Sequence, residues 1–334
     1  MPKSERQKMK LLAIKDILYA KTDEEHSITT AQLIEELEKL DIKAERKSIY
    51  QDIQTLEDMG VDVVKQTKHP KGYYIAGREF ELAEVKMLVD IVQAARFLTP
   101  RKSREMVRKL EGLVSEHQAR QLQRTLLVSA RPKTGNETIY YNVDAIHHAI
   151  NSDRKISFLY CEWNVKKQLS PKRGGNRYMV NPCALLWDSE NYYLMAYEEK
   201  DGVMKNYRVD KMFRIQVEND HREGKEALKG FDPSEYSRKV FAMFSGEEEV
   251  VSLRVHAMYI GVILDRFGPE TTVRQLSDTE AEVRITVEVS NQFFGWLAGM
   301  GEGIEILSPQ PVREQYRKHL DTILKNYENN NNNK

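Results

Sequence analysis

The chain has 334 residues, more than one compact core normally holds, so two or more domains are expected. Hydrophobic residues make up 40% and charged residues 31% of the sequence, which is typical of a folded soluble protein and not of a disordered chain. The 51 basic and 51 acidic residues cancel, which excludes a histone-like blanket of positive charge but leaves room for local basic faces.

Targeting and redox signals are sparse. No apolar run approaches the length of about 18 residues that a membrane-spanning helix needs. The apolar stretch 11–20 is interrupted by Lys15 and Asp16, so we expect no signal peptide and a cytoplasmic location. Two cysteines, Cys161 and Cys183, are too few for a disulfide framework or a zinc site, and we expect neither a metal nor a cofactor.

Residues 1–77 are expected to form a first domain. Apolar residues at helical spacing predict a helix over 8–20. Thr29 followed by Gln32 predicts a second helix that begins with a capping box. A third helix is expected to end at Gly60, and its apolar residues Ile49, Ile53 and Leu56 follow the helical spacing i, i+4, i+7.

The third predicted helix has a polar face that suits DNA. Two β-prone runs, 61–65 and 73–75, follow it and predict a hairpin with a lysine-bearing tip. Arg and Gln can read base edges, while Lys, Ser and Tyr can reach phosphate oxygens. The DNA-contacting candidates are Arg46, Lys47, Ser48, Tyr50 and Gln51 on the helix and Lys65, Lys68 and Lys71 on the hairpin. A solvated helix and a solvated hairpin are the alternative, but the two in this order favour a winged helix-turn-helix.

The run 46–53, with Leu56 and Gly60 after it, resembles the recognition helix of DeoR-type winged helix-turn-helix regulators. The resemblance implies a DNA-binding domain. Glu45 and Gln51 stand where the family usually has Ser and Arg, a departure that affects the DNA sequence bound and not the assignment.

Residues 78–136 form a basic connector with 12 Lys and Arg against 7 Asp and Glu. Helices are expected over 80–95, from Pro100 onward and over 115–127, with an interdomain loop at 131–136. Helices in this place commonly pair across a two-fold axis, so we expect a homodimer. A helical spacer within a monomer is the alternative.

A third domain is expected over residues 137–220. A short helix, 143–150, precedes strand-like runs, and together they suggest a small, strongly bent barrel. The runs are 155–163, 178–187, 191–197 and 205–212. Between the first two lies a segment, 166–177, with five basic residues and no acidic one.

This domain resembles the WYL domain, named for a Trp-Tyr-Leu run on a strand. Tyr192 stands where Trp is usual, Tyr193 and Leu194 match, Arg208 and Asp210 match the downstream signature, and Lys211 replaces an Arg. Residues 180–182 resemble the family's preceding strand and turn. The resemblance implies an Sm-like or SH3-like barrel that senses a nucleic acid or nucleotide-like ligand through a basic, aromatic surface.

The candidate ligand contacts in this domain are Tyr192, Tyr193, Arg208, Lys172, Arg173 and Lys211. Neighbouring residues on a strand point to opposite faces, so one of Tyr193 and Leu194 is expected in the core, and we assign Leu194 that place. Arg208 is the favoured ligand contact. Arg208 and Asp210 share a face, however, so a simple pairing between them is the alternative.

Residues 221–328 are expected to form a fourth domain, followed by a disordered tail, 329–334. The predicted order βαββαβ, then α, resembles the ferredoxin-like extension that accompanies many WYL proteins. Residues 247–249, three glutamates, are interpreted as a solvated loop. The aromatic run 293–297 is interpreted as core.

The complete prediction is an α+β multidomain protein: winged helix-turn-helix, helical connector, WYL barrel and ferredoxin-like domain. The sequence contains no catalytic motif that we recognise, so we expect no enzyme. The predicted function is a ligand-responsive, sequence-specific transcriptional regulator. Its partners would be a double-stranded DNA operator and a single-stranded nucleic acid or nucleotide. The alternative is an accessory module that binds nucleic acid through the WYL domain.

Overall fold

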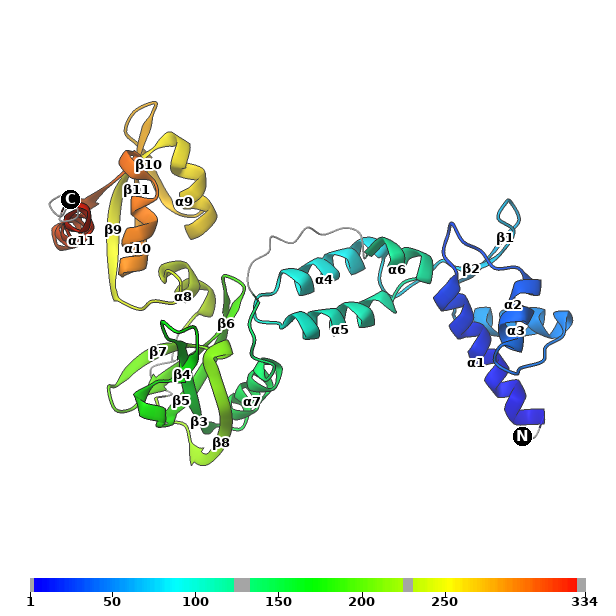
Figure 1. Ribbon diagram of the computed structural model, residues 1–334. Helices are drawn as coiled ribbons and strands as arrows, with labels where there is room; N and C mark the ends of the chain where they lie inside the picture. Colours follow the sequence, from blue (N-terminus) through cyan, green and yellow to red (C-terminus); the bar gives the residue numbers. More distant parts are fainter. Residues whose placement is uncertain (1–2, 123–132, 225–230, 329–334) are drawn as a thin grey trace. The chain divides into compact units, whose positions relative to one another are not determined.

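The computed structural model describes residues 3–122, 133–224 and 231–328, shown in Figure 1. The chain divides into two compact units, Met1–Glu137 and Thr138–Lys334. The end of the helix predicted over 115–127, the start of the loop 131–136 and the predicted tail lie outside the described residues. Among those residues, no helix is long and apolar enough to cross a membrane.

Three helices and a hairpin open the first unit. They are α1 (Lys3–Lys21), α2 (Thr30–Glu38), α3 (Arg46–Asp58), β1 (Val63–Gln66) and β2 (Gly72–Ile75). The predicted capping box is confirmed, because the Thr29 hydroxyl accepts from the Gln32 N–H while Gln32 Oε1 accepts from the Thr29 N–H. Gly60 follows α3 with φ of +85°, the left-handed conformation that a helix end of this type favours.

The apolar faces of these elements pack into one core. It is formed by Ile14 and Leu18 of α1, Leu33 and Leu37 of α2, Ile49, Ile53 and Leu56 of α3, and Tyr73 and Ile75 of β2. An ion pair between Lys10 Nζ and Asp52 Oδ2, 2.7 Å long, joins α1 to the flank of α3. These contacts hold the apolar face of α3 against the core, so its polar face lies at the surface.

Three further helices complete the first unit: α4 (Leu82–Ala94), α5 (Pro100–Glu111) and α6 (Glu116–Leu122). Helices α4 and α5 pack side by side (Figure 1). Arg78 attaches this part to α1, because its Nη2 donates to the carbonyls of Tyr19 (2.7 Å) and Thr22 (2.6 Å). The imidazole rings of His26 and His117 stack with centroids 3.8 Å apart. These contacts join residues before and after position 78 into one unit.

The second unit begins with α7 (Ile139–Asn151) and a curled antiparallel sheet. Its strands are β3 (Arg154–Trp163), β4 (Leu169–Pro171), β5 (Tyr178–Asp188), β6 (Asn191–Glu198), β7 (Val203–Arg208) and β8 (Met212–His221). Their order is β4-β3-β5-β6-β7, and β8 pairs with β3. Because β3 has three partners, the sheet curls on itself.

The predicted strand 205–212 is wrong in its bounds. A 3-10 turn, η2 (Val209–Lys211), ends β7 and redirects the chain into β8. Strand β8 was not predicted, although its apolar residues Phe213, Ile215 and Val217 alternate with polar ones.

The remainder of the second unit contains a four-stranded sheet covered by helices. Its elements are α8 (Pro233–Lys239), β9 (Glu247–His256), α9 (Ile260–Phe267), β10 (Thr272–Gln275), β11 (Glu280–Val289), α10 (Asn291–Ala298), β12 (Ile304–Ser308) and α11 (Gln310–Glu328). The strand order is β10-β11-β9-β12, antiparallel throughout. Phe293, Phe294 and Leu297 lie in its core, as predicted.

The interpretation of 247–249 as a loop is wrong. These three glutamates begin β9 and pair with Val287–Val289 of β11. The strand tolerates them because backbone groups make the pairing while the carboxylates of this strand end stay at the surface. Helix α8 was also missed, because its seven residues are too few for a periodic apolar signal.

Candidate functional site

In the first unit, the predicted DNA contacts lie at the surface of α3 and of the hairpin. Arg46, Lys47, Tyr50 and Gln51 are exposed at the beginning of α3. Ser48 is half-buried, and its hydroxyl donates to the Glu45 carbonyl at 2.9 Å. Glu45 provides no side-chain cap for α3, and the Ser48 hydroxyl, which donates to a carbonyl, does not satisfy the free N–H groups of this helix end.

Four of these residues meet in one groove. Arg46 and Tyr50 of α3 and Lys65 and Lys71 of the hairpin line a groove of about 530 Å³, which also includes residues at the start of α2. Arg46 Nε donates to the Tyr50 hydroxyl at 2.9 Å, and this bond lowers the pKa of Tyr50. Lys47, Ser48, Gln51 and Lys68 lie outside the groove, and of these only Ser48 is not fully exposed.

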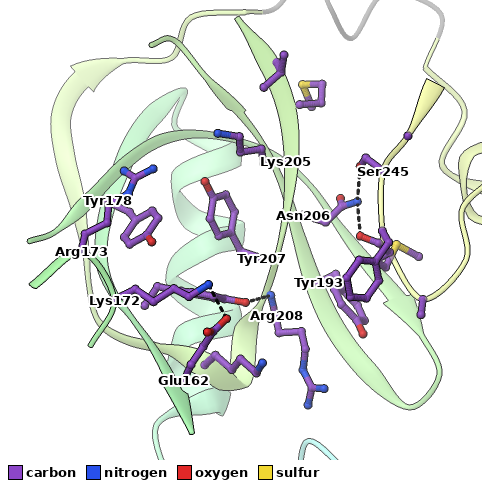
Figure 2. Close-up of a pocket in the computed structure, with 18 residues that line it drawn as sticks. Glu162, Lys172, Arg173, Tyr178, Tyr193, Lys205, Asn206, Tyr207, Arg208 and Ser245 are labelled. Atoms are coloured by element: carbon purple, nitrogen blue, oxygen red, sulfur yellow. Dashed lines mark hydrogen bonds and ion pairs between the residues drawn. The ribbon is translucent and has the colours of Figure 1, made fainter. Parts of the chain in front are cut away.

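In the second unit, a groove of about 910 Å³ opens on the curled sheet (Figure 2). Five of the six predicted ligand contacts line it: Tyr193, Arg208, Lys172, Arg173 and Lys211. Tyr192 does not. It lies beside Trp187 with ring centroids 4.8 Å apart, because successive residues of β6 point to opposite faces. Leu194 is fully buried, as predicted.

Most cations of this groove already have a carboxylate partner. Lys172 Nζ lies 2.7 Å from Glu162 Oε1, and Arg173 Nη2 lies 2.9 Å from Glu198 Oε1. Lys205 pairs with both Glu198 and Asp201. Lys211 makes no ion pair with any residue that the structure describes. An anion entering the groove therefore meets Lys211, which has no carboxylate partner among the described residues, and several cations that are already paired with carboxylates.

Arg208 pairs with Asp210, which the sequence analysis gave as the alternative to ligand contact. Its Nε and Nη2 donate to the two carboxylate oxygens of Asp210 at 3.0 and 2.8 Å, and Nη2 also donates to Asn191 Oδ1 at 3.0 Å. Burial alone would lower the pKa of this guanidinium, but the hydrogen bonds and charge of Asp210 raise it. Arg208 is thus a permanently charged group held in a fixed orientation at the groove.

Tyrosine rings form the floor between these cations. Tyr160, Tyr178 and Tyr207 pack with one another at centroid separations of 5.5 to 5.8 Å. Burial raises the pKa of Tyr160 to about 12, and its hydroxyl accepts from the Arg208 N–H. The Tyr207 hydroxyl is buried without a hydrogen-bond partner among the described residues, and burial raises its pKa as well. Both hydroxyls are therefore neutral near pH 7, and each can donate a hydrogen bond to an anion.

Part of the groove was missed by the sequence reasoning. Lys205 and Asn206 of β7 line it, and so does the segment 242–246, which follows α8. Lys205 could have been found, since it lies on the same predicted strand as Arg208. The segment 242–246 could not, because it comes from beyond the domain expected at 137–220.

The described residues contain no group of three or more His, Cys, Asp or Glu side chains able to hold a metal ion. The side chains that line the two grooves offer guanidinium, ammonium and phenol groups and aromatic faces.

Comparison with known families identifies two domains in the second unit. The WYL domain model matches residues 141–217, and the WCX domain model matches residues 247–324. The chain therefore contains a region that matches the WYL domain, which confirms that part of the prediction, and its match to the WCX domain lies where the C-terminal extension was expected.

Two solved structures are distantly similar. Proteasome accessory factor B/C (PafBC) of Arthrobacter aurescens shares 16% identity, with a TM-score of 0.28, over 97% of this chain and 49% of that chain. The chain thus spans about half the length of that protein. A CRISPR Cas-related protein shares 13% identity, with a TM-score of 0.37, over 74% of this chain and 81% of that chain. Comparison with curated proteins gives no significant match.

Proposed function

We propose that the protein is a ligand-responsive, sequence-specific DNA-binding regulator of transcription. In this proposal residues 1–77 are a DeoR-type winged helix-turn-helix, residues 137–220 are an Sm-like sensor barrel, and the WCX domain is ferredoxin-like. The observation that carries the proposal is the exposed polar beginning of α3 beside a hairpin with Lys65, Lys68 and Lys71.

The geometry of this surface suits duplex DNA. A helix of this width fits the major groove, where Arg46 and Gln51 would reach base edges. The hairpin lysines would contact phosphates, which position the protein without reading sequence. The groove that Arg46 shares with Lys65 and Lys71 has the charge to hold a backbone phosphate between helix and hairpin.

The groove of the second unit is the proposed sensor. Aromatic faces stack nucleobases, and cations hold phosphates, so its ligand is a nucleotide or a short single strand. Lys211 is the group best prepared to receive an anion, because it makes no ion pair with the described residues. The paired cations would exchange their carboxylates for phosphate oxygens.

Regulation follows if the ligand favours one arrangement of a homodimer, since a ligand shifts an equilibrium only through its differential affinity for the two states. In this scheme the protein works in the cytoplasm, needs no cofactor and catalyses no reaction. The strand order β10-β11-β9-β12 supports a ferredoxin-like WCX domain.

The proposal is tested by footprinting on the DNA upstream of the protein's own gene. Replacement of Arg46 and Lys47 by Ala should weaken binding by about 1–3 kcal/mol and reduce its salt dependence. The matched control is R317A/K318A, which removes the same charge from exposed positions on α11. The control should keep the footprint.

A protected site that survives R46A/K47A unchanged in a folded protein would remove the helix-turn-helix assignment. If instead no duplex is protected while single strands bind the second unit, the protein is an accessory nucleic-acid-binding module.

A further inference from the structure

The segment from Phe241 to Gly246 closes one side of the sensor groove. It lies between the two matched families, after residue 217 and before residue 247. Residues Ala242 to Gly246 line the groove together with Val203 and Met204 of β7. Figure 2 shows Asn206 and Ser245 across the groove from Arg173 and Tyr178. The segment 242–246 contributes no charged side chain to the groove, whereas Lys172 and Arg173 lie on the other side.

The segment is a tight turn with an unusual backbone. Phe241 and Phe244 bridge each other, and the Phe244 N–H donates to the Phe241 carbonyl at 3.0 Å. The two residues between them, Ala242 and Met243, have φ of +49° and +59°. Neither is glycine or asparagine, so this left-handed conformation is strained and must be imposed by the surroundings.

Several contacts impose it. Asn206 Nδ2 donates to the Tyr236 hydroxyl at 2.7 Å and to the Met243 carbonyl at 3.2 Å. Glu288 Oε2 accepts from the Gly246 N–H at 2.9 Å. A Cβ on Gly246 would collide with the Val289 carbonyl oxygen, so only glycine fits this close approach. The turn is therefore held from both sides, by β7 and by β11.

The turn presents a phenylalanine to solvent. Phe244 is 57% exposed, whereas Phe241 and Met243 beside it are each 6% exposed. An immobilised turn that buries its neighbours and leaves one large aromatic ring at a binding groove is typical of a contact surface for a ligand. The exposed ring and the cations line one groove, so the groove fits a molecule that has both an anionic and a flat apolar part.

We propose that Phe244 is a stacking platform for a nucleobase, and that the turn 241–246 is a ligand-binding element of the sensor contributed from outside the WYL domain. The proposal rests on the proposed function, because it takes the groove to be the sensor site. The phosphate of the ligand lies toward Lys211 and Arg208, and its base lies on the Phe244 ring. Specificity for a base-bearing anion over a bare anion then comes from this one side chain.

The experiment compares two probes on the full chain by fluorescence anisotropy. One is labelled pentathymidylate, and the other is a labelled abasic deoxyribose-phosphate pentamer with the same charge. Wild-type protein should bind the thymidylate about ten-fold more tightly, since stacking of one base on an aromatic ring is worth a factor of about 5 to 150. Phe244→Ala should abolish the difference and leave abasic binding unchanged, while Phe244→Tyr should keep it.

Two further variants separate stacking from charge and from general loss of aromatic surface. Lys211→Ala should weaken both probes by the same factor, because it removes a cation that both share. Trp163→Ala removes an exposed ring that lies outside the groove and should change neither probe.

Retention of the full base-dependent difference in Phe244→Ala would overturn the role of Phe244 while the sensor assignment stands. Equal binding of both probes by the wild type would also overturn the role of Phe244. Failure of the wild type to bind either probe would overturn the sensor assignment itself, and the role of Phe244 with it.

Discussion

Replacement of Glu198 by Gln tests how the sensor groove is held together. Glu198 is a carboxylate with a side chain only 6% exposed, yet it accepts from Arg173 and from Lys205. Removal of one partner from a fully buried ion pair typically costs about 3–5 kcal/mol. Here Arg173 and Lys205 are 47% and 35% exposed and can be hydrated instead, so the expected loss is about 1–2 kcal/mol at pH 7.

The pH dependence gives the same prediction an independent check. Burial would raise the pKa of Glu198, but the hydrogen bonds from Lys205 and Arg173 lower it below its ordinary value of 4.5. A carboxyl whose pKa is lowered by folding stabilises the protein above its unfolded pKa, and this stability is lost as the pH falls through the folded pKa. The difference between wild type and Glu198→Gln should therefore be constant from pH 5 to 8 and shrink in more acidic solution.

Urea denaturation followed by tryptophan fluorescence measures this difference, since Trp163, Trp187 and Trp296 all lie in the second unit. The matched control is Glu199→Gln. Glu199 is 40% exposed, and its partner Lys155 keeps a second carboxylate, Glu223, at 3.0 Å. The control should lose less than about 1 kcal/mol. A Glu198→Gln loss no larger than that of the control, or one that persists undiminished at pH 3, would refute the reasoning.

Three further predictions concern the two units separately. Replacement of Lys65, Lys68 and Lys71 by Ala should weaken specific and random duplexes equally, because phosphates carry no sequence; an effect confined to one base of the operator in competition binding would contradict this. Leu194→Ala, at a fully buried site, should destabilise the second unit by about 2–5 kcal/mol in urea, and a loss below 1 kcal/mol would mean that the site is not core. Thr29→Ala removes the capping hydroxyl of α2 and should cost about 1 kcal/mol in thermal unfolding of the first unit, whereas Thr29→Ser should restore most of it.

Local patterns predicted much of the fold correctly. The capping box at Thr29 and the end of α3 at Gly60 depend on side chains and backbone within a few residues, so the sequence contains them directly. The burial of Leu194 followed from strand alternation. The aromatic core around Phe293 followed from helical spacing.

The errors occur where distant contacts decide the conformation. The strand expected over 205–212 breaks at Val209 because the chain must turn there to bring β8 against β3, and no local signal requires this turn. Glu247 and its two neighbours enter a strand because β11 supplies backbone partners. Strand propensity cannot reveal such pairing.

In the candidate site, too, local spacing predicted some features while tertiary contacts decided others. Alternation on β6 could have placed Tyr192 outside the groove once Tyr193 was assigned to it. The pairing of Arg208 with Asp210 was foreseen as an alternative because both residues share one face of the chain. Phe244 was not foreseen, because a turn that is more than 30 residues from Arg208 reaches the groove only through tertiary structure.

In the proposed function, a ligand bound in the sensor groove of the second unit changes the affinity of α3 in the first unit for DNA. The direct test is operator affinity measured with and without saturating pentathymidylate, in wild type and in Lys211→Ala. Lys211 is preferable to Arg208 here, because its removal breaks no ion pair with the described residues, whereas Arg208→Ala would strand Asp210. Pentathymidylate should change the operator affinity of the wild type by about five-fold or more, and Lys211→Ala should need a higher concentration for the same change. Operator affinity that is identical with and without the oligonucleotide, although the oligonucleotide is bound, would contradict the proposed function.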